Sequence, residues 1–292
     1  MHASMTGRIC LITGATSGIG AATAEALVRR GATLVLVGRD RAKCEATAEV
    51  LRRLGGGPVD FLVADLSVQS EVHRLASEFQ QKYPQLHVLV NNASAIFLRR
   101  TETVDGIEST FALNHLAYFL VTNLLLDRLK ASAPARVVNV SSIGHSHVNG
   151  INFDDLQWRR SYRGFKAYHQ SKLANLMFTY ELAGRLRGTG VTVNALHPGM
   201  VTTNIGRNNG WLWRIGKPLG DRYFGFKYVT AAEGAQTVVY LASSPDVEGV
   251  TGKYFDDQKP VESSAASRDE TAAARLWQMC EELTGIGASV RR

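Results

Sequence analysis

The chain alternates short runs of apolar, β-branched residues with longer amphipathic segments. Runs of strand length lie at residues 8–12, 33–37, 59–63, 87–90, 136–140 and 191–196. Such short runs fit strands that are buried on both faces of a parallel sheet. Helical patterns cover residues 21–30, 41–54, 108–130 and 166–187. Repeated strand–helix–strand units predict an α/β fold: a Rossmann-type, doubly wound parallel sheet of about seven strands with helices on both faces.

The composition indicates one domain over residues 1–292. Hydrophobic residues make up 45% of the chain and charged residues 20%, which are ordinary values for a globular protein. Two long irregular stretches, 144–165 and 197–228, interrupt the strand–helix rhythm, and long loops in compact domains are often functional. We expect a substrate lid at about 197–228 and a C-terminal extension at about 257–292.

Charge, cysteine usage and hydropathy exclude several other classes of protein. The net charge of +7 arises from Lys and Arg scattered among acidic residues, so no nucleic-acid partner is indicated. The three cysteines have no metal-ligand spacing; they indicate neither a disulfide framework nor a zinc site and suit a reducing compartment. The strand pattern at 8–12 leaves no room for a signal peptide before it, and no segment approaches the roughly 20 apolar residues that a bilayer requires. We therefore expect a cytoplasmic protein with no integral membrane segment.

A glycine-rich turn follows the first predicted strand and leads directly into a helix. Glycines there permit a tight turn and let backbone N–H groups approach a diphosphate, to which the helix N-terminus adds its partial positive charge. A plain structural turn is the alternative, but the strand before and the helix after favour a dinucleotide site. The residues expected to form this site are Gly14, Thr16, Ser17, Gly18, Ile19 and Gly20.

The end of the second predicted strand distinguishes the two nicotinamide cofactors. A carboxylate there would bind the ribose hydroxyls of NAD, whereas this chain has Arg39. A guanidinium can bind a 2′-phosphate bidentately. At about 4 Å and an effective dielectric near 20, the charge pair is worth on the order of 4 kcal/mol before desolvation. The sequence favours NADP(H) over NAD(H), with the alternative that Arg39 is a solvated charge and Asp40 binds the ribose.

Two further strand ends carry candidate cofactor contacts. Asp65 and Leu66 follow the third strand. We expect Asp65 to hydrogen-bond near the adenine or to cap the helix that starts around 67–69, two roles that are compatible. Asn92 and Ala93 follow the fourth strand, at the same edge of the sheet, where ligands of doubly wound folds bind.

Tyr168 and Lys172 stand four residues apart on a predicted helix, so their side chains share a face. A free tyrosine has a pKa near 10, and a nearby ammonium lowers an acidic pKa by about 1–3 units. In the reductive direction, a protonated tyrosine is the acid that a carbonyl requires. A Tyr-x-x-x-Lys pair is also common on surface helices. Here Ser142 ends a strand of the doubly wound sheet, where a hydroxyl can bind a substrate carbonyl and stabilise oxyanion charge.

Asn114 lies inside the long predicted helix. An asparagine inside a helix usually costs stability and often points to solvent. We instead expect Asn114 to hold a proton-relay water or a bent helix geometry.

Together, these residues resemble the short-chain dehydrogenase/reductase superfamily over about residues 8–256. The ordered set is Thr-Gly-x3-Gly-x-Gly, Asn-Asn-Ala, a helical Asn, a strand-end Ser, Tyr-x3-Lys and Pro-Gly. At finer grain, Ser171-Lys172-Leu173-Ala174-Asn175 and His197-Pro198-Gly199 are similar to the retinol dehydrogenase and WW-domain oxidoreductase-like branch. One departure is Ser94, where the family has glycine after Asn-Asn-Ala.

The resemblance implies a role for each matching residue. Asn114, Ser142, Tyr168 and Lys172 match the catalytic tetrad. Tyr168 would be the acid/base and Ser142 would orient the carbonyl, while Lys172 would bind the nicotinamide ribose and Asn114 would anchor a relay water. The segment that would hold the nicotinamide carboxamide includes Pro198, Gly199, Val201 and Thr203.

The substrate is expected to be a carbonyl or alcohol compound, but the sequence does not identify it. Aromatic residues crowd the stretches 211–215 and 223–228. They fit an apolar lid over a lipophilic aldehyde, ketone or alcohol, or ordinary packing, or a peripheral membrane contact. The resemblance implies a homodimer or homotetramer through the helices at about 108–130 and 164–187.

The leading hypothesis is an NADP(H)-dependent oxidoreductase that transfers a hydride between nicotinamide and a carbonyl or alcohol. One alternative is a catalytically silent NADP(H)-binding sensor or interaction protein on the same fold. Another is a lyase or epimerase that uses its cofactor only transiently. The tyrosine–lysine pair favours the oxidoreductase, because a chain that only binds cofactor has no use for both residues together.

Overall fold

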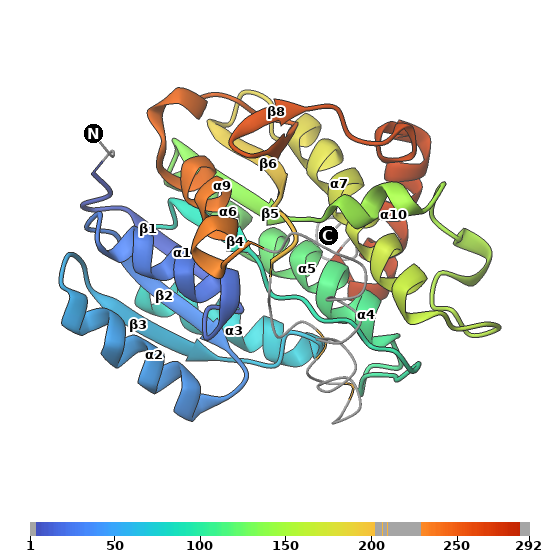
Figure 1. The fold of residues 1–292 in the computed structure, drawn as a ribbon, viewed down its shortest axis with the longest axis horizontal. Coiled ribbons are helices and arrows are strands. Elements are labelled where there is room, and N and C mark those ends of the chain that lie inside the picture. Colours follow the sequence, from blue (N-terminus) through green and yellow to red (C-terminus); the bar gives the residue numbers. More distant parts are fainter. Residues whose placement is uncertain (1–3, 202–205, 207–208, 210–228, 287–292) are drawn as a thin grey trace.

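A single mixed sheet forms the centre of the protein (Figure 1). The computed structural model describes residues 4–201, 206, 209 and 229–286. The strands are β1 (Ile9–Thr13), β2 (Thr33–Gly38), β3 (Val59–Val63), β4 (Val88–Asn91), β5 (Ala135–Val140), β6 (Val191–His197), β7 (Lys253–Asp256) and β8 (Lys259–Val261). Their order is β3-β2-β1-β4-β5-β6-β7-β8. The first seven strands run parallel, as predicted, and the chain adds an eighth, antiparallel strand within its C-terminal extension.

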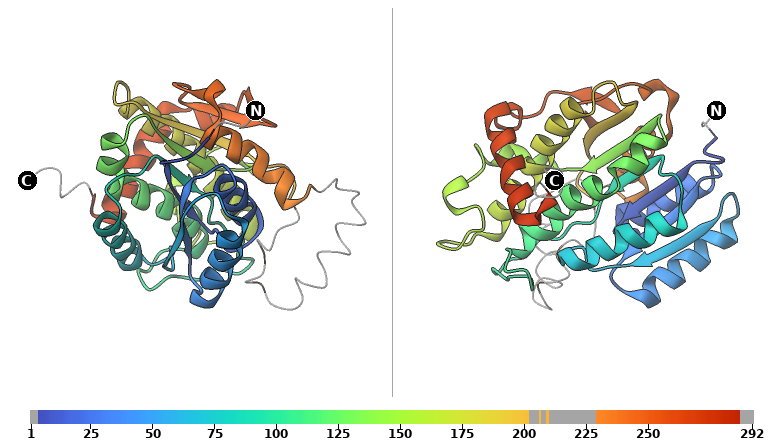
Figure 2. Two further views of the ribbon diagram at one scale, coloured as in Figure 1. Left: turned by 90° about the vertical axis from the view of Figure 1, so that its left-hand side faces the viewer. Right: turned by 180° about the vertical axis from the view of Figure 1, so that it is seen from behind.

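Helices cover both faces of this sheet, as predicted (Figure 2). One layer consists of α1 (Gly18–Val28), α2 (Arg41–Leu54) and α9 (Ala231–Ser243). The other contains α3 (Gln69–Lys82), α5 (Ala117–Leu124), α7 (Gly164–Arg185) and α10 (Glu270–Thr284). Each layer buries its own apolar cluster against the sheet, so the core is split by the strands into two halves.

The long helix expected at 108–130 is interrupted. It consists of α4 (Ser109–Phe111), a π-helical turn η1 (Ala112–Leu116), α5 and α6 (Leu126–Ala131). The buried Glu108 caps the start, because its carboxylate accepts hydrogen bonds from the N–H groups of Thr110 and Phe111 at 2.7 and 2.8 Å. A π-turn shifts the helix register by one residue and leaves main-chain groups without their ordinary helical partners.

The C-terminal extension folds back onto its own chain. It contains β8, the short helix η6 (Ala265–Arg268) and α10, which packs along α7. Trp277 of α10 lies edge-on to Phe119 of α5, with ring centroids 4.9 Å apart, and stacks on Phe178 of α7 at 5.8 Å. The extension therefore packs on the helices of its own chain.

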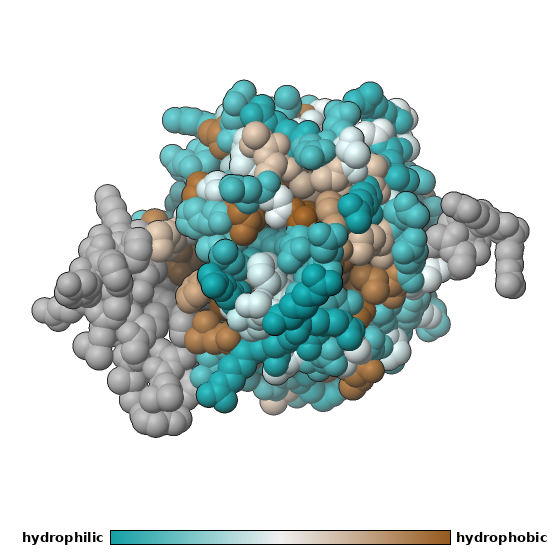
Figure 3. Space-filling view, turned by 90° about the vertical axis from the view of Figure 1, so that its right-hand side faces the viewer, coloured by the Kyte–Doolittle hydropathy of each residue, from teal (hydrophilic) through white to brown (hydrophobic). Residues whose placement is uncertain are grey.

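Hydrophilic side chains predominate on the face of the molecule that Figure 3 shows, with hydrophobic ones in small areas between them. Within the described ranges, no helix is both long and apolar enough to cross a membrane. The same residues contain no group of three or more His, Cys, Asp or Glu side chains able to hold a metal ion.

Candidate active site

The strand order reverses direction between β1 and β4. The chain moves outward from β1 to β3 and then returns to the other side of β1 with β4. Ligands of doubly wound folds bind beyond the carboxyl ends of the strands at such a switch point. Of the predicted site residues, those that follow β1, β4, β5 and β6 belong to this edge.

The turn after β1 is shaped by glycines that no larger residue can replace. Gly14 and Gly18 have φ angles of 65° and 56°, in the left-handed region that favours glycine. A Cβ atom on Gly14 would lie 2.9 Å from Cα of Ala93, and one on Gly20 would lie 2.4 Å from the carbonyl oxygen of Gly14. The sequence therefore has residues without side chains at the positions where the chain enters α1.

The start of α1 also has the electrostatic character of an anion site. Its N-cap, Ser17, makes no side-chain capping hydrogen bond, and the first turn contains no acidic residue. The first N–H groups and the positive end of the helix dipole are then not neutralised by the helix's own side chains. These residues fit the diphosphate of a dinucleotide cofactor.

Asn92 and Ala93 hold the glycine turn against the end of β4. The side chain of Asn92 donates to the carbonyl of Thr13 at 2.8 Å. The backbone N–H groups of Asn92 and Ala93 both donate to the hydroxyl of Thr13, at 2.8 and 3.1 Å. Thr13 begins the glycine motif but was not predicted as a site residue, because the motif does not show that its hydroxyl acts across strands.

The geometry separates the two candidates for the adenosine ribose end. Arg39 is exposed directly after β2. Asp40 is the N-cap of α2: its carboxylate accepts from the N–H of Lys43 at 3.2 Å and pairs with the Lys43 ammonium at 2.7 Å. The hydrogen bond from the Lys43 side chain lowers the pKa of Asp40. Thr16 lies beside these residues, because a Cβ on Gly38 would approach its methyl group to 2.8 Å.

The expectation that Asp65 caps the helix starting around 67–69 is wrong: the N-cap of α3 is Val68, with no side-chain capping hydrogen bond, and Asp65 instead shapes the turn before that helix. Its carboxylate accepts from the N–H and the hydroxyl of Ser67 at 2.9 and 2.7 Å, just before α3. Leu66 is buried in the apolar cluster that contains α3 and α5. Contact of either residue with an adenine stays a prediction.

Tyr168 and Lys172 lie one turn apart on α7, beside the end of β5. Nζ of Lys172 lies 5.6 Å from the ring centroid of Tyr168 and donates to the carbonyl of Val140 at 3.0 Å. Ser142 follows β5, where its hydroxyl accepts from the N–H of Gly144 at 3.1 Å. The structure thus brings the predicted phenol, amine and hydroxyl together.

Burial controls the protonation of this cluster. It raises the pKa of Tyr168 to about 12, against a smaller lowering by the hydrogen bond with Ser142. It lowers the pKa of the Lys172 ammonium to about 7. The shift of the tyrosine pKa is opposite to the expected lowering by a nearby ammonium, because removal from water disfavours the phenolate more than its surroundings stabilise it.

Asn114 lies inside the π-turn η1 and is fully buried. Its side chain accepts from the N–H of Ala95 at 2.9 Å and donates to the Ala95 carbonyl at 2.9 Å and to the Ser171 hydroxyl at 3.1 Å. Asn114 therefore ties the segment after β4 to α7, between Tyr168 and Lys172. The π-turn around Asn114 is compatible with the bent helix geometry expected of it; that role and the relay water both stay predictions.

The Pro-Gly segment after β6 packs beside the glycine turn. A Cβ on Gly234 of α9 would lie 2.5 Å from a methyl of Val201, 3.0 Å from the Pro198 carbonyl and 3.5 Å from Ile19. Gly199 has a φ of 80°, which permits the turn between them. Thr203 and most of the predicted lid at 197–228 lie outside the described residues.

The loop after Ser142 folds over the outer face of α7. His145 is buried: its Nδ1 contacts the Ser142 carbonyl at 2.7 Å, and its Nε2 accepts from the N–H of Ser264 at 3.2 Å.

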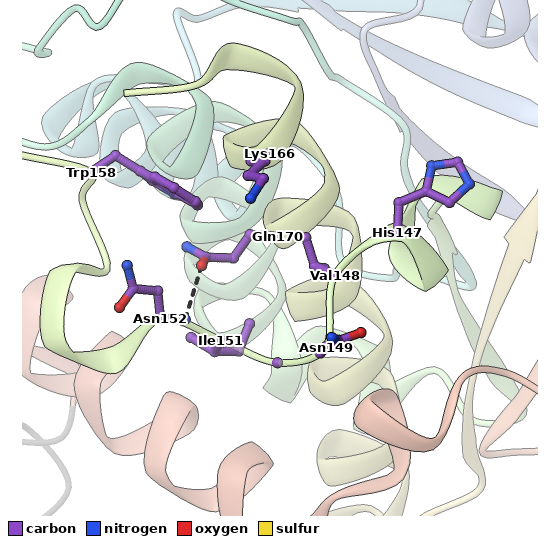
Figure 4. Close-up of a pocket in the computed structure, with 9 residues that line it drawn as sticks. His147, Val148, Asn149, Ile151, Asn152, Trp158, Lys166 and Gln170 are labelled. Carbon is purple, nitrogen blue, oxygen red and sulfur yellow. Dashed lines mark hydrogen bonds between the residues drawn. The ribbon is translucent and has the colours of Figure 1, made fainter. Parts of the chain in front are cut away.

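Further along the same loop, the N–H of Asn152 donates to the Gln170 side chain at 2.9 Å. Gln170 and its neighbours line an open pocket of about 320 Å³ (Figure 4). Gln170 is two residues from Tyr168, so the pocket lies on the opposite side of the helix.

The comparison with known families agrees with this geometry. The model of the short chain dehydrogenase family matches residues 8–210. The chain belongs to the short-chain dehydrogenase family. It is accordingly an oxidoreductase.

Within this family, the similar curated proteins are retinol dehydrogenases. The chain is 46% identical to retinol dehydrogenase 14 of Mus musculus over 97% of this chain and 87% of that protein. It is 42% identical to retinol dehydrogenase 13 of Homo sapiens over 99% of this chain and 88% of that protein. The predicted retinol dehydrogenase-like branch is therefore confirmed.

Solved structures of short-chain dehydrogenases share the fold. An uncharacterised protein from Mycobacterium Paratuberculosis superposes with a TM-score of 0.77 at 37% identity, covering 97% of this chain and 96% of the other. The Pseudomonas aeruginosa RhlG/NADP active-site complex superposes with a TM-score of 0.71 at 28% identity, over 87% and 97%.

Proposed function

We propose that this short-chain dehydrogenase is an NADP(H)-dependent carbonyl reductase that also runs in reverse as an alcohol dehydrogenase, with a lipophilic substrate. The observation that carries the proposal is the cluster of Tyr168, Ser142 and Lys172 at the edge of the sheet where the glycine turn also lies. A phenol, a hydroxyl and an amine at this edge of the sheet supply the proton, the oxyanion contact and the charge that carbonyl reduction requires.

The bound nicotinamide would supply or accept the hydride. In reduction, Tyr168 donates its proton to the substrate oxygen, since a pKa of about 12 keeps the phenol protonated at neutral pH. Ser142 donates a hydrogen bond to the same oxygen as negative charge develops there. Lys172, whose pKa of about 7 leaves it partly protonated near neutrality, would bind the nicotinamide ribose and would stabilise negative charge on the tyrosine during the transfer.

The preference for NADP(H) rests on the different surroundings of Arg39 and Asp40. The Asp40 carboxylate is engaged in capping α2 and in pairing with Lys43. An NAD-selecting contact to the ribose hydroxyls would compete with both interactions. Arg39, exposed at the same strand end, has the charge and shape to bind a 2′-phosphate. Some similar structures are complexes with NADP.

The positions of the exposed apolar side chains support the proposal of a lipophilic substrate. Among the described residues, the exposed large hydrophobic ones are Val50, Leu98, Val104, Ile143, Phe165, Met200 and Val261. Ile143 adjoins Ser142, Phe165 lies on the first turn of α7, and Met200 follows the Pro-Gly segment. Apolar surface next to a polar reaction centre suits an apolar aldehyde or ketone, and the relatives' names make a retinoid-like compound the first to test.

Tyr168→Phe tests the reaction directly. Initial rates with NADPH and a panel of aliphatic, aromatic and retinoid aldehydes should fall at least about a hundredfold, since a general acid typically contributes 10²–10⁴. NADPH affinity should change little, because only one hydroxyl is removed. Tyr240→Phe, a phenol on α9, is the matched control and should keep full activity. Comparable rates in the wild type and Tyr168→Phe would contradict the assignment. NADPH binding without turnover in the wild type would support the silent sensor instead.

Arg39→Ala tests the cofactor preference. Loss of charge-assisted hydrogen bonds worth about 1.5–3 kcal/mol should raise the NADPH dissociation constant roughly tenfold to a hundredfold and leave NADH nearly unaffected. Arg41→Ala removes an equally exposed charge two residues away and should change neither cofactor. Equal weakening of NADPH and NADH by Arg39→Ala would exclude the 2′-phosphate contact. Homo-oligomer formation and a cytoplasmic location stay predictions.

A further inference from the structure

The main-chain carbonyl of Asn114 is held by a buried residue of α7. Within the π-turn η1, this carbonyl accepts a hydrogen bond from the side-chain amide of Asn175 at 2.9 Å. Asn175 follows Ser171 by one helical turn, and the Ser171 hydroxyl accepts from the side chain of Asn114. The π-turn is thus docked on two successive turns of α7, the helix that also presents Tyr168 and Lys172.

His115 fixes the orientation of Asn175. The amide nitrogen of Asn175 already donates to Asn114, so its oxygen must face Nδ1 of His115, 3.0 Å away. An amide oxygen only accepts, so Nδ1 must carry the hydrogen. Burial lowers the pKa of His115 to about 4. The ring is then neutral, and its Nε2 is left as an acceptor.

The C-terminal helix completes the chain of hydrogen bonds. Sγ of Cys280, on α10, lies 3.4 Å from Nε2 of His115. Because Nε2 carries no hydrogen, the thiol is the donor. The donors therefore run in one direction, from Cys280 to His115, from His115 to Asn175, and from Asn175 to the carbonyl of Asn114. All four residues are buried, so no water competes for these bonds.

We propose that His115 and Asn175 are positioning residues for catalysis, which hold the Asn114 main chain against the turn of α7 that carries Tyr168 and Lys172. The inference rests on the proposed reductase function for its kinetic consequence. A small displacement of a catalytic group can lower the reaction rate strongly. A displacement of about 1 Å lowers the rate by up to roughly a hundredfold. Loss of the contact between His115 and Asn175 should therefore lower kcat while leaving the NADPH dissociation constant unchanged.

Two substitutions of His115 separate positioning from packing. Asparagine can present its amide N–H near the place of Nδ1, so His115→Asn keeps the donor to Asn175 and loses the contact with Cys280. Glutamine reaches the place of Nε2, so His115→Gln keeps the contact with Cys280 and loses the donor. We expect His115→Asn to retain kcat close to that of the wild type and His115→Gln to lose roughly tenfold or more. Equal losses would show that only the volume of the imidazole matters and would overturn the proposal.

A measurement without turnover tests the same chain of bonds. In protein labelled with ¹⁵N-histidine, the His115 ring should have its proton on Nδ1 and remain neutral down to about pH 5, given its pKa of about 4. A ring protonated on Nε2 would exclude the arrangement, whether or not an aldehyde is reduced. Absence of turnover by the wild type with every aldehyde, together with the expected tautomer, would refute the reductase function and leave the bonding arrangement standing.

Discussion

Lys172 is charged in the unfolded chain and must lose much of its solvation when the protein folds. Its side chain is 1% exposed. Nζ donates to the carbonyl of Val140 at 3.0 Å and lies 5.9 Å from the ring of Tyr118. Burial lowers its pKa from 10.5 to about 7. Burial of this amine should therefore lower the free energy of unfolding. Replacing the lysine by methionine, which has a similar length, should restore that free energy.

The size of the effect follows from the pKa shift. At 1.36 kcal/mol per pKa unit, a shift from 10.5 to about 7 costs the folded state about 4 kcal/mol at pH 7.5. Lys172→Met removes this cost but leaves the carbonyl of Val140 without its donor, which costs about 1–3 kcal/mol. The expected net gain in unfolding free energy is about 2 kcal/mol, together with loss of turnover.

The gain should depend on pH with a defined sign. Between the folded pKa of about 7 and the unfolded pKa of 10.5, the unfolded wild type binds one more proton than the folded protein. Wild-type stability therefore rises with pH relative to the variant, by about 1.4 kcal/mol per pH unit. The advantage of Lys172→Met should shrink from about 2 kcal/mol near pH 7.5 to almost nothing near pH 9. Measurements stop there, because Tyr168 begins to ionise in the unfolded chain near pH 10.

Equilibrium urea unfolding of the cofactor-free protein, at several pH values in parallel, measures this difference. Lys166→Met, which replaces an exposed lysine of the same helix, is the control and should show no pH-dependent gain. A variant that is less stable than the wild type near pH 7.5, or a difference that stays constant to pH 9, would refute the argument from desolvation.

Two other perturbations follow from packing. Gly20→Ala places a methyl group 2.4 Å from the carbonyl oxygen of Gly14. The substitution should lower the free energy of unfolding by about 1–3 kcal/mol and abolish thermal stabilisation by NADPH. Gly184→Ala has no atom within 4 Å of the new methyl group and should be neutral or slightly stabilising, as melting temperatures with and without NADPH will show. Trp277 is only 6% exposed. Trp277→Ala should therefore lower the free energy of unfolding, measured in urea, by about 3–5 kcal/mol. A loss below about 1 kcal/mol would mean that α10 is not firmly packed.

The elements that sequence reasoning predicted well are those with a strong local signal. The strand at 59–63 and the helix at 41–54 have the predicted bounds, because buried parallel strands and amphipathic helices carry their periodicity within a few residues. The eighth strand has no such signal: all three of its residues are exposed, and it exists only through pairing with β7. The break in the helix at 108–130 likewise depends on partners outside that helix, Ala95 and Asn175.

The same distinction applies to the site. Spacing alone was enough to bring Tyr168 and Lys172 together, because residues four apart on a helix share a face. The direction of the tyrosine pKa shift was predicted wrongly, since it depends on burial by distant segments. Asn175 stood within the motif that carried the family resemblance, but its function became visible only when its amide was found on the carbonyl of Asn114.

The C-terminal helix bears on the expected homo-oligomer. That expectation places the contact on the helices at 108–130 and 164–187, and α10 of the same chain already packs against both. Trp277 fills the space between Phe119 and Phe178, and the guanidinium of Arg185 lies 4.1 Å from the centre of its ring. Removing α10 to admit a second subunit would expose this aromatic cluster and break the contact of Cys280 with His115. A homo-oligomer formed through this side of the molecule should therefore include the outer face of α10 in its interface, and substitutions there should affect assembly before they affect the site.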